Sequence, residues 1–342
     1  MNQPLSHVQY AKIIARQYGV GRAMRFWLAA LADRAAMQNW VAFVEAHLPP
    51  PSRLAMVMRP LRPYMRQNFD VAARRNVLQQ HLTIMADYGL TGEALAAEPG
   101  VVVAALSGKS GVVHTVHFGG NTSKEGEVAF TFLDDQGQML AKITGTLAQE
   151  TGGERLFWVG GLQGAKPPLG RDEIVKATRD LYGLRPKGAV LLALQAFAQA
   201  LQLTAIHAPG NEGHISQRGL RRLREKRKIY ADYGQFWEEI GGVKIGAEEY
   251  RLPIIPLVRS IEEVKQNKRS EWKKRQALSE QIATETTATL ARLSHGTVRI
   301  MQAPDEQQSK EQRSDGHVGD VEHIDEQRQQ IDKAGEHAVV NA

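Results

Sequence analysis

Apolar residues recur with a helical period through the first hundred residues of the chain. Trp27, Leu28 and Leu31 have the spacing of one helix face, so we expect them to form an apolar stripe that faces a core. The three prolines at 49–51 end this helical stretch, because proline has no amide hydrogen to donate. A second helical pattern spans residues 68–88. The sequence therefore predicts a helical N-terminal half.

After Pro99 the pattern changes to the two-residue period of β-strands. Residues 101–106 form a valine-rich run, and Asp134 to Gly137 has the composition of a turn between paired strands. Expected strands lie at 101–106, 112–118, 127–133, 139–147, 155–162 and 203–207, with helices at 171–182 and 189–201. This order predicts an α+β fold, in which a mixed, mostly antiparallel sheet with flanking helices follows the helical half.

Charge divides the chain further. Residues 301–342 carry ten acidic and four basic side chains, whereas residues 1–300 carry a formal net charge of +12. The acidic segment is rich in glutamine and nearly free of aromatic residues, which is typical of a disordered tail. We expect four parts: a helical region at 1–98, an α+β domain at 99–259, a charged helix within 260–299 and an acidic tail at 300–342.

The composition excludes several classes of site. The chain of 342 residues has no cysteine, which excludes disulfides, cysteine-ligated metals and thiol catalysis. Gln195, Gln199 and Gln202 interrupt the longest uncharged run, 188–211, so we expect a half-buried helix there rather than a membrane span. The first residues lack the apolar core of a secretory signal. We expect a cytoplasmic protein, peripheral at the inner membrane if its basic faces meet anionic lipid.

Two loops have residues suited to binding a ligand. Glycines within Gly160–Gly164 would let another backbone or a ligand approach a strand end closely, and a simple tight bend is the alternative. Arg185, Lys187 and the Gly188 backbone precede the most apolar helix, and two cations with free amides at a helix start suit a phosphate. Solvated charges at an ordinary helix start are the alternative there.

A third loop carries candidate catalytic groups. Glu212 and His214 follow a buried strand and would act as general bases, with Asn211 as an amide donor, unless they are merely exposed. His114 and His117 lie three apart on an expected strand, hence on opposite faces, and cannot hold one metal ion together. We therefore expect no metal site.

Two segments are strongly basic. Residues 216–229 and 265–275 are rich in lysine and arginine, and Trp272 lies within the second. Such patches bind nucleic acid, anionic lipid headgroups or acidic carrier proteins, and a solvated helix face is the alternative.

Several segments of the sequence resemble a known family. The segments 159–164 and 181–187 are similar to the VirK/YbjX family of Gram-negative bacteria over about residues 15–290. Further matching positions are Arg59 to Tyr64, Tyr230, Asp232-Tyr233, Phe236-Trp237, Glu239, Gly241-Gly242, Tyr250 to Pro253 and Lys268-Arg269. The resemblance implies an association with virulence and with survival of antimicrobial peptides, but no defined reaction.

The order of elements also resembles that of GNAT acyltransferases, at the level of the fold. In those enzymes a loop of the form Arg/Gln-x-x-Gly-x-Gly/Ala binds the pyrophosphate of acyl-CoA, and Arg185 and Gly188 fit its first positions. Val190 stands where Gly or Ala is expected, and Asn211 precedes Tyr230 by more residues than is usual before the general-acid tyrosine.

Two hypotheses follow. The first is an acyltransferase without a metal that uses acyl-CoA or acyl carrier protein, and acylates an envelope lipid, an amine or a protein. Arg185, Lys187 and Gly188 would hold the donor phosphates, and Tyr230 or Tyr233 would protonate the leaving thiol. The second is a non-enzymatic adaptor, whose basic faces bind anionic lipid, nucleic acid or a partner protein.

Overall fold

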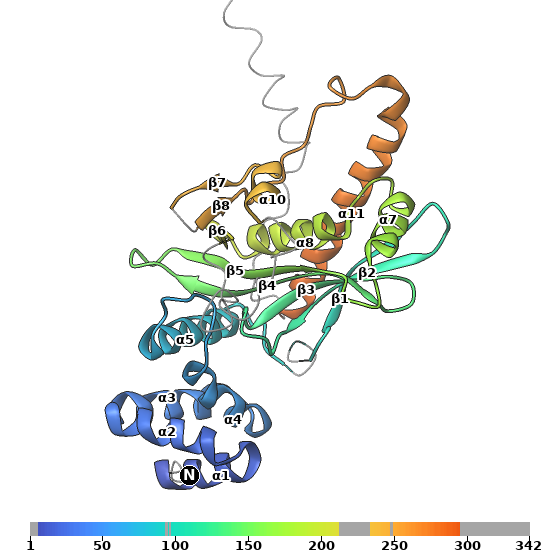
Figure 1. Cartoon of the computed structure of the whole chain (residues 1–342). Helices are drawn as coiled ribbons and strands as arrows, with labels where there is room; N and C mark the ends of the chain where they lie inside the picture. The colour runs from blue at the N-terminus through green and yellow to red at the C-terminus, as the bar shows by residue number, and fades with distance from the viewer. Residues whose placement is uncertain (1–5, 93–94, 96, 212–232, 247–248, 295–342) are drawn as a thin grey trace, which may run out of the picture. The chain divides into compact units, whose positions relative to one another are not determined.

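The computed structural model describes residues 6–92, 95, 97–211, 233–246 and 249–294, and everything below concerns those residues (Figure 1). The N-terminal part is helical, as predicted. Its helices are α1 (His7–Tyr18), α2 (Val20–Ala32), α3 (Arg34–His47), α4 (Pro50–Met58) and α5 (Val71–Asp87). The prolines act as predicted, because α3 ends at His47 and α4 begins anew with Pro50 in its first turn.

The predicted inward face of α2 is wrong. Trp27, Leu28 and Leu31 are 39%, 58% and 66% exposed, whereas Phe26 and Ala30 are buried against the other helices. Almost every position between 20 and 32 is apolar, so periodicity alone could not choose which face packs inward. An apolar face of α2 is therefore left uncovered in the described part of the chain.

The second half forms an eight-stranded sheet in the order β1-β2-β3-β4-β5-β6-β8-β7. The strands are β1 (Val101–Ser107), β2 (Val113–Gly120), β3 (Val128–Leu133), β4 (Met139–Gln149), β5 (Arg155–Gly164), β6 (Ala205–Pro209), β7 (Val243–Lys244) and β8 (Glu249–Leu252). Every neighbouring pair is antiparallel except β5 and β6, which are parallel. This confirms the predicted α+β class with a mixed, mostly antiparallel sheet.

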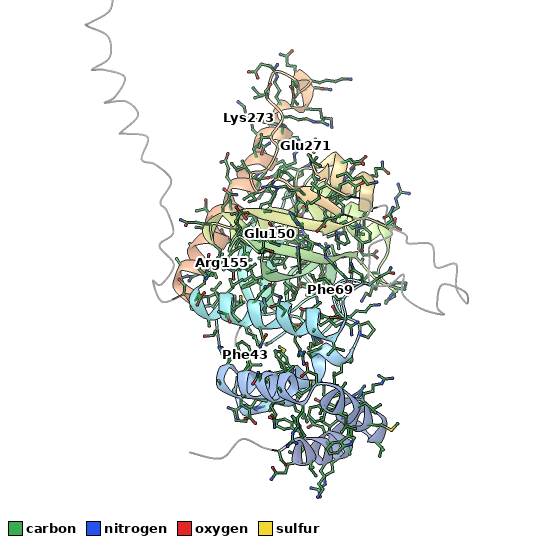
Figure 2. The ribbon with its side chains drawn as sticks, turned by 90° about the vertical axis from the view of Figure 1, so that its left-hand side faces the viewer. Phe43, Phe69, Glu150, Arg155, Glu271 and Lys273 are labelled. Carbon is green, nitrogen blue, oxygen red and sulfur yellow. The ribbon has the colours of Figure 1, made fainter. Side chains whose placement is uncertain are left out.

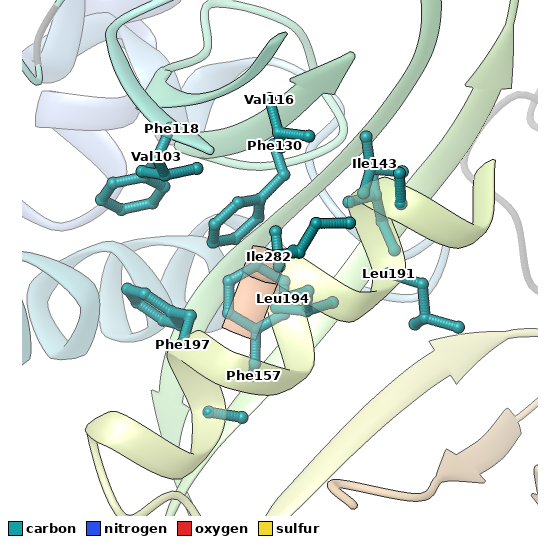
Figure 3. Close-up of a cluster of buried hydrophobic side chains, with 14 of the residues drawn as sticks. Val103, Val116, Phe118, Phe130, Ile143, Phe157, Leu191, Leu194, Phe197 and Ile282 are labelled. Atoms are coloured by element: carbon teal, nitrogen blue, oxygen red, sulfur yellow. The ribbon is translucent and has the colours of Figure 1, made fainter. Parts of the chain in front are cut away.

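Helices pack on both faces of the sheet. On one face lie α8 (Pro186–Ala200) and α11 (Arg269–Leu293), and α5 lies on the other (Figure 1). Phe118, Phe130 and Phe157 of the sheet meet Phe197 of α8 in the main core, which Ile282 of α11 completes (Figure 3). Two short helices complete the fold. In the chain, α7 (Arg171–Asp180) lies between β5 and α8, and α10 (Tyr233–Glu239) lies between β6 and β7.

A buried arginine joins the helical segment to the sheet. Arg59 follows α4 in a short 3₁₀ turn, and its guanidinium donates to the Glu127 carboxylate at 2.7 Å. It also donates to the carbonyl oxygens of Asn121, Thr122, Ser123 and Gly126, at 3.2, 2.7, 2.6 and 2.9 Å. These contacts fix the loop between β2 and β3 against the end of α4.

Nearby contacts strengthen the same junction. Tyr64 shares a 2.6 Å hydrogen bond with Thr146 of β4, and Phe69, which Figure 2 labels, packs against Trp158 of β5. None of the helices in the described part of the chain combines the length and apolar character that a bilayer crossing requires. The division of the chain at residues 98, 259 and 299 stays a prediction.

Candidate functional site

The candidate site lies where β5 leaves β6. The two parallel strands pair only through Leu156 to Trp158, opposite residues 205–207. Beyond that point β5 continues along β4 to Gly164, while β6 pairs with β8. Within the described residues, the second half of β5 therefore has no strand on its β6 side. Ligands of α/β sheets commonly bind at such divergent carboxyl ends.

A bulge at Gly160 marks the start of the divergence. The register of β4 and β5 shifts there, so that Thr144 faces Gly161 and Gly145 faces Val159. A Cβ at Gly160 would lie 1.9 Å from the carbonyl oxygen of Glu125, so only glycine fits. The glycine thus permits the expected close approach of another backbone, and the segment up to Gly164 continues as strand β5 with a bulge.

The start of α8 reaches the end of β5. A Cβ added to Gly164 would lie 3.7 Å from Cε of Lys187, so the lysine stem lies directly beside the strand end. The Lys187 ammonium group lies 5.9 Å from the centre of the Phe236 ring. Burial lowers the pKa of Lys187, and no acidic partner lies within ion-pair distance among the described residues. A half-buried cation without a counter-charge is a favourable place for an anion.

Arg185 and Gly188 differ from Lys187 in their surroundings. Arg185 is the N-cap residue of α8, and its side chain is 71% exposed, 3.9 Å from Glu239. Gly188 is half-buried within the first turn, where amides have no partner inside the helix. The fold thus brings Lys187 and Gly188 to the end of β5 and leaves Arg185 in solvent.

Tyr233 lies against the edge of β5 beyond the point where β6 stops pairing with it. Its hydroxyl donates to the carbonyl oxygen of Leu162 in β5 at 3.1 Å, and its ring stacks on Trp237. Asn211, at the end of β6, accepts a 2.8 Å hydrogen bond from the Tyr233 amide. Burial, with a smaller effect of the Glu125 carboxylate, raises the pKa of Tyr233 to about 12. The phenol is therefore protonated at neutral pH and able to donate a proton.

Glu125 is a site residue that the sequence did not suggest. It is 8% exposed and accepts a 2.6 Å hydrogen bond from Gln163 of β5. Its loop, between β2 and β3, is held by Arg59, a residue more than sixty positions earlier in the chain. No local pattern around Glu125 indicates this placement, because a distant side chain determines it.

The remaining candidates are placed differently. Glu212, His214 and Tyr230 lie outside the described residues, as does the basic segment 216–229. The second basic segment, 265–275, is described: Glu271 accepts from Lys109 and Lys268, at 3.0 and 3.3 Å, and lies near Lys273 at the start of α11 (Figure 2).

The histidines of β2 have separate surroundings. His114 is buried 3.2 Å from Asp180 and stacks on Phe132, while His117 lies 3.4 Å from the carbonyl oxygen of Gly100. Among the described residues, no group of three or more histidine and carboxylate side chains is arranged to hold a metal ion.

Comparison with known proteins places the chain in a family. The family model described as a protein of unknown function (DUF535) matches residues 17–288. The chain is 38% identical over 237 residues to the uncharacterized protein YbjX of Escherichia coli K12, an alignment that covers 65% of this chain and 69% of YbjX. It is also 26% identical over 125 residues to an uncharacterized protein of Haemophilus influenzae, covering 36% of this chain and 41% of that protein. The expected VirK/YbjX-like relationship is thereby confirmed, and the chain belongs to the DUF535 family.

Proposed function

We propose that the chain is an acyltransferase whose donor carries a phosphopantetheine arm, as acyl-CoA and acyl carrier protein do. The observation that carries this proposal is the Lys187 ammonium group, half-buried beside the unpaired half of β5 with no acidic partner among the described residues. Together with the free amides of the first turn of α8, it is suited to a phosphate group. In the same proposal the acyl donor lies along β5, in the manner of GNAT acyltransferases.

The phenol and carboxylate beside β5 supply the proton transfers in this proposal. A general base accepts the proton of the acceptor's amine or hydroxyl. The candidates are the carboxylates of Glu125 and Glu212 and the imidazole of His214. The acceptor then bonds to the acyl carbon as the carbon–sulfur bond breaks. Tyr233 gives its hydroxyl proton to the leaving thiolate and is reprotonated from solvent. The acceptor class stays as expected from the sequence: an envelope lipid, an amine or a protein.

Replacing Lys187 by Gln tests the donor site. We expect the affinity for CoA to fall roughly tenfold to a hundredfold, because a hydrogen bond to a charged group contributes about 1.5–3 kcal/mol. The melting temperature should stay the same or rise, since the half-buried charge is removed. Isothermal titration with CoA, and with pantetheine that lacks phosphates, separates binding of the phosphates from binding of the arm.

Matched variants complete this test. Lys176→Gln removes an exposed lysine of α7 and should leave CoA affinity unchanged, whereas Tyr233→Phe should keep CoA affinity and lower the rate of thiol release from acyl-CoA. Equal affinity for pantetheine and CoA would contradict the role of Lys187. Absence of binding by wild type to both CoA and acyl carrier protein would remove the acyltransferase proposal altogether.

The adaptor hypothesis remains the alternative function. It is favoured by exposed lysines at the start of α11 and just before it, of which Lys273 and Lys265 have no ion pair among the described residues. It requires binding that weakens steeply with salt and no thiol release from any acyl donor. The association of the resembled family with virulence and antimicrobial-peptide survival stays an expectation under either function.

A further inference from the structure

Most of the exposed large apolar side chains of the N-terminal helices lie on the uncovered face of α2. Five residues within one arc of about 100° make up this apolar face of α2. They are Val20, Met24, Trp27, Leu28 and Leu31, exposed by 75%, 60%, 39%, 58% and 66%. Two turns of contiguous exposed leucine, methionine and tryptophan are unusual on a surface that meets only water.

A cationic hollow lies beside the same helix. Arg22 and Arg25 of α2 and Arg62, just after the 3₁₀ turn, line a small cavity of about 80 Å³ together with Tyr18, Met58 and Leu61. We refer to it as the arginine hollow. Arg22 also lies over the Tyr18 ring, 5.3 Å from its centre.

The three guanidinium groups are not neutralised by the protein around them. Among the described residues, none of Arg22, Arg25 and Arg62 forms an ion pair or a hydrogen bond through its side chain. Burial, followed by the charges of Arg59 and Arg22, lowers the pKa of Arg62. The charge of Glu127 acts on Arg62 without forming an ion pair with it, so three convergent cations without an ion-paired carboxylate form a site for a multivalent oxyanion such as phosphate.

The charge of the surrounding segment has the same sign. Residues 6–66 contain nine lysines and arginines and only two acidic residues, Asp33 and Glu45. Asp33 caps α3, and Glu45 accepts a hydrogen bond from Tyr10, so both have local partners. The neighbourhood of the hollow is therefore strongly cationic and would attract an extended anionic surface.

The apolar face and the cations occupy adjacent parts of the helix circumference. At 100° per residue, Arg25 lies about 60° beyond Leu28 on the helix circumference and Arg22 about 60° further round, with only glycine and alanine positions between the apolar arc and these arginines. Apolar residues with a tryptophan, bordered by arginines on one side, are typical of helices that lie in the interface of a membrane. The arginines then reach the phosphate layer while the apolar residues enter the acyl boundary.

We propose that the apolar face of α2 and the arginine hollow together dock on an anionic membrane surface, with a lipid phosphate held by Arg22, Arg25 and Arg62. Charge complementarity selects a membrane over an apolar protein partner or a second copy of the chain, because a second copy would bring further cations to the same face. The proposal does not depend on the acyltransferase hypothesis, since α2 and the hollow share no residue with Lys187, Tyr233 or Glu125.

Vesicle binding by the full chain tests the proposal. Wild type should co-sediment with vesicles of phosphatidylcholine and phosphatidylglycerol and not with pure phosphatidylcholine. Leu28→Glu/Leu31→Glu should weaken this binding at least tenfold, and Arg22→Gln/Arg25→Gln should do the same while also reducing its salt dependence. All four side chains are exposed, so these variants should keep the circular dichroism and melting temperature of wild type.

Matched controls carry the same chemistry elsewhere. Ile255→Glu/Val258→Glu alters two residues that are 72% and 60% exposed, and Arg171→Gln/Lys176→Gln removes two exposed cations of α7. Both should bind vesicles as wild type does. Brominated lipid should quench a part of the tryptophan fluorescence that Trp27→Phe removes, which places α2 itself in the interface.

Other outcomes would overturn the proposal. Unchanged vesicle binding by Leu28→Glu/Leu31→Glu would show that another surface meets the membrane. Equal binding to both vesicle types would remove the role of the arginine hollow. Binding of soluble glycerol phosphate without vesicle binding would make the hollow a small-molecule site. A dimer that Leu28→Glu/Leu31→Glu dissociates, again without vesicle binding, would assign the face to a second copy.

Discussion

Replacing Arg59 by Met should destabilise the protein more than most single substitutions. The guanidinium is almost fully buried and neutralises Glu127, whose side chain is 10% exposed. Methionine fills much of the same volume but leaves Glu127 and several backbone carbonyls without their donor. Removing one partner of a buried ion pair costs about 3–5 kcal/mol, so we expect a loss of that size at pH 7.5.

The pH dependence of this loss identifies its cause. Burial raises the pKa of Glu127 in the wild type, against the opposing effect of Arg59, and removing Arg59 raises that pKa further. A carboxyl with a raised pKa in the folded state costs stability above its unfolded pKa, and this cost falls as the pH is lowered. The variant's stability therefore falls with rising pH over a wider window than that of the wild type, so the effect of Arg59→Met should be smaller at pH 5.5 than at pH 7.5.

Urea denaturation at the two pH values measures this effect. The double variant Arg59→Met/Glu127→Leu, which removes both charges, should recover a large part of the loss at pH 7.5, because no uncompensated charge remains. A loss below about 1 kcal/mol at pH 7.5 would refute the reasoning, since that is no more than an exposed pair contributes. A loss that grows as the pH falls would refute it equally, because Glu127 would then not be the group left uncompensated.

Two further predictions concern the sheet and the helix that covers it. Gly160→Ala should cost about 1–3 kcal/mol in urea denaturation, because the added methyl group meets the Glu125 backbone, whereas Gly152→Ala, which meets nothing within 4 Å, should cost less than 1 kcal/mol. His81 is buried and its ring accepts from the Leu147 amide at 3.2 Å, and burial lowers its pKa to about 3. Because the folded-state pKa lies below the unfolded value, stability should fall as the pH drops from about 6.5 towards 3, and His81→Gln should flatten that fall in melting curves recorded across this range.

The predictable parts of the structure are those that local patterns determine. The alternating pattern of β2 and β3 and the mostly apolar run of α8 identified these elements, because their local sequence pattern reflects their burial. The face of α2 could not be predicted, since apolar residues surround the helix and only tertiary packing selects Phe26 and Ala30.

The candidate site was predictable only where a motif and its contacts are neighbours in sequence. Lys187 and Gly188 could be assigned to a helix start from the Arg-Pro-Lys-Gly segment alone. Glu125 could not, because Arg59 positions its loop through contacts across more than sixty residues. The role of Tyr233 on the β5 edge likewise depends on a hydrogen bond to Leu162, seventy-one positions away.

At the end of β5 the phenol of Tyr233, rather than a neighbouring strand, bonds to the strand edge. This arrangement bears on how the chain avoids self-association. Backbone groups on an unpaired strand invite pairing with another molecule, and natural sheets protect them with charges, bulges or a covering element. Here a single ring at the start of α10 occupies the carbonyl of Leu162, so the protection depends on that short helix remaining docked through Trp237 and Pro209. Any ligand that displaced the ring would have to satisfy the same carbonyl, and a displaced ring would take away the protection that the described residues give this edge against intermolecular β-pairing.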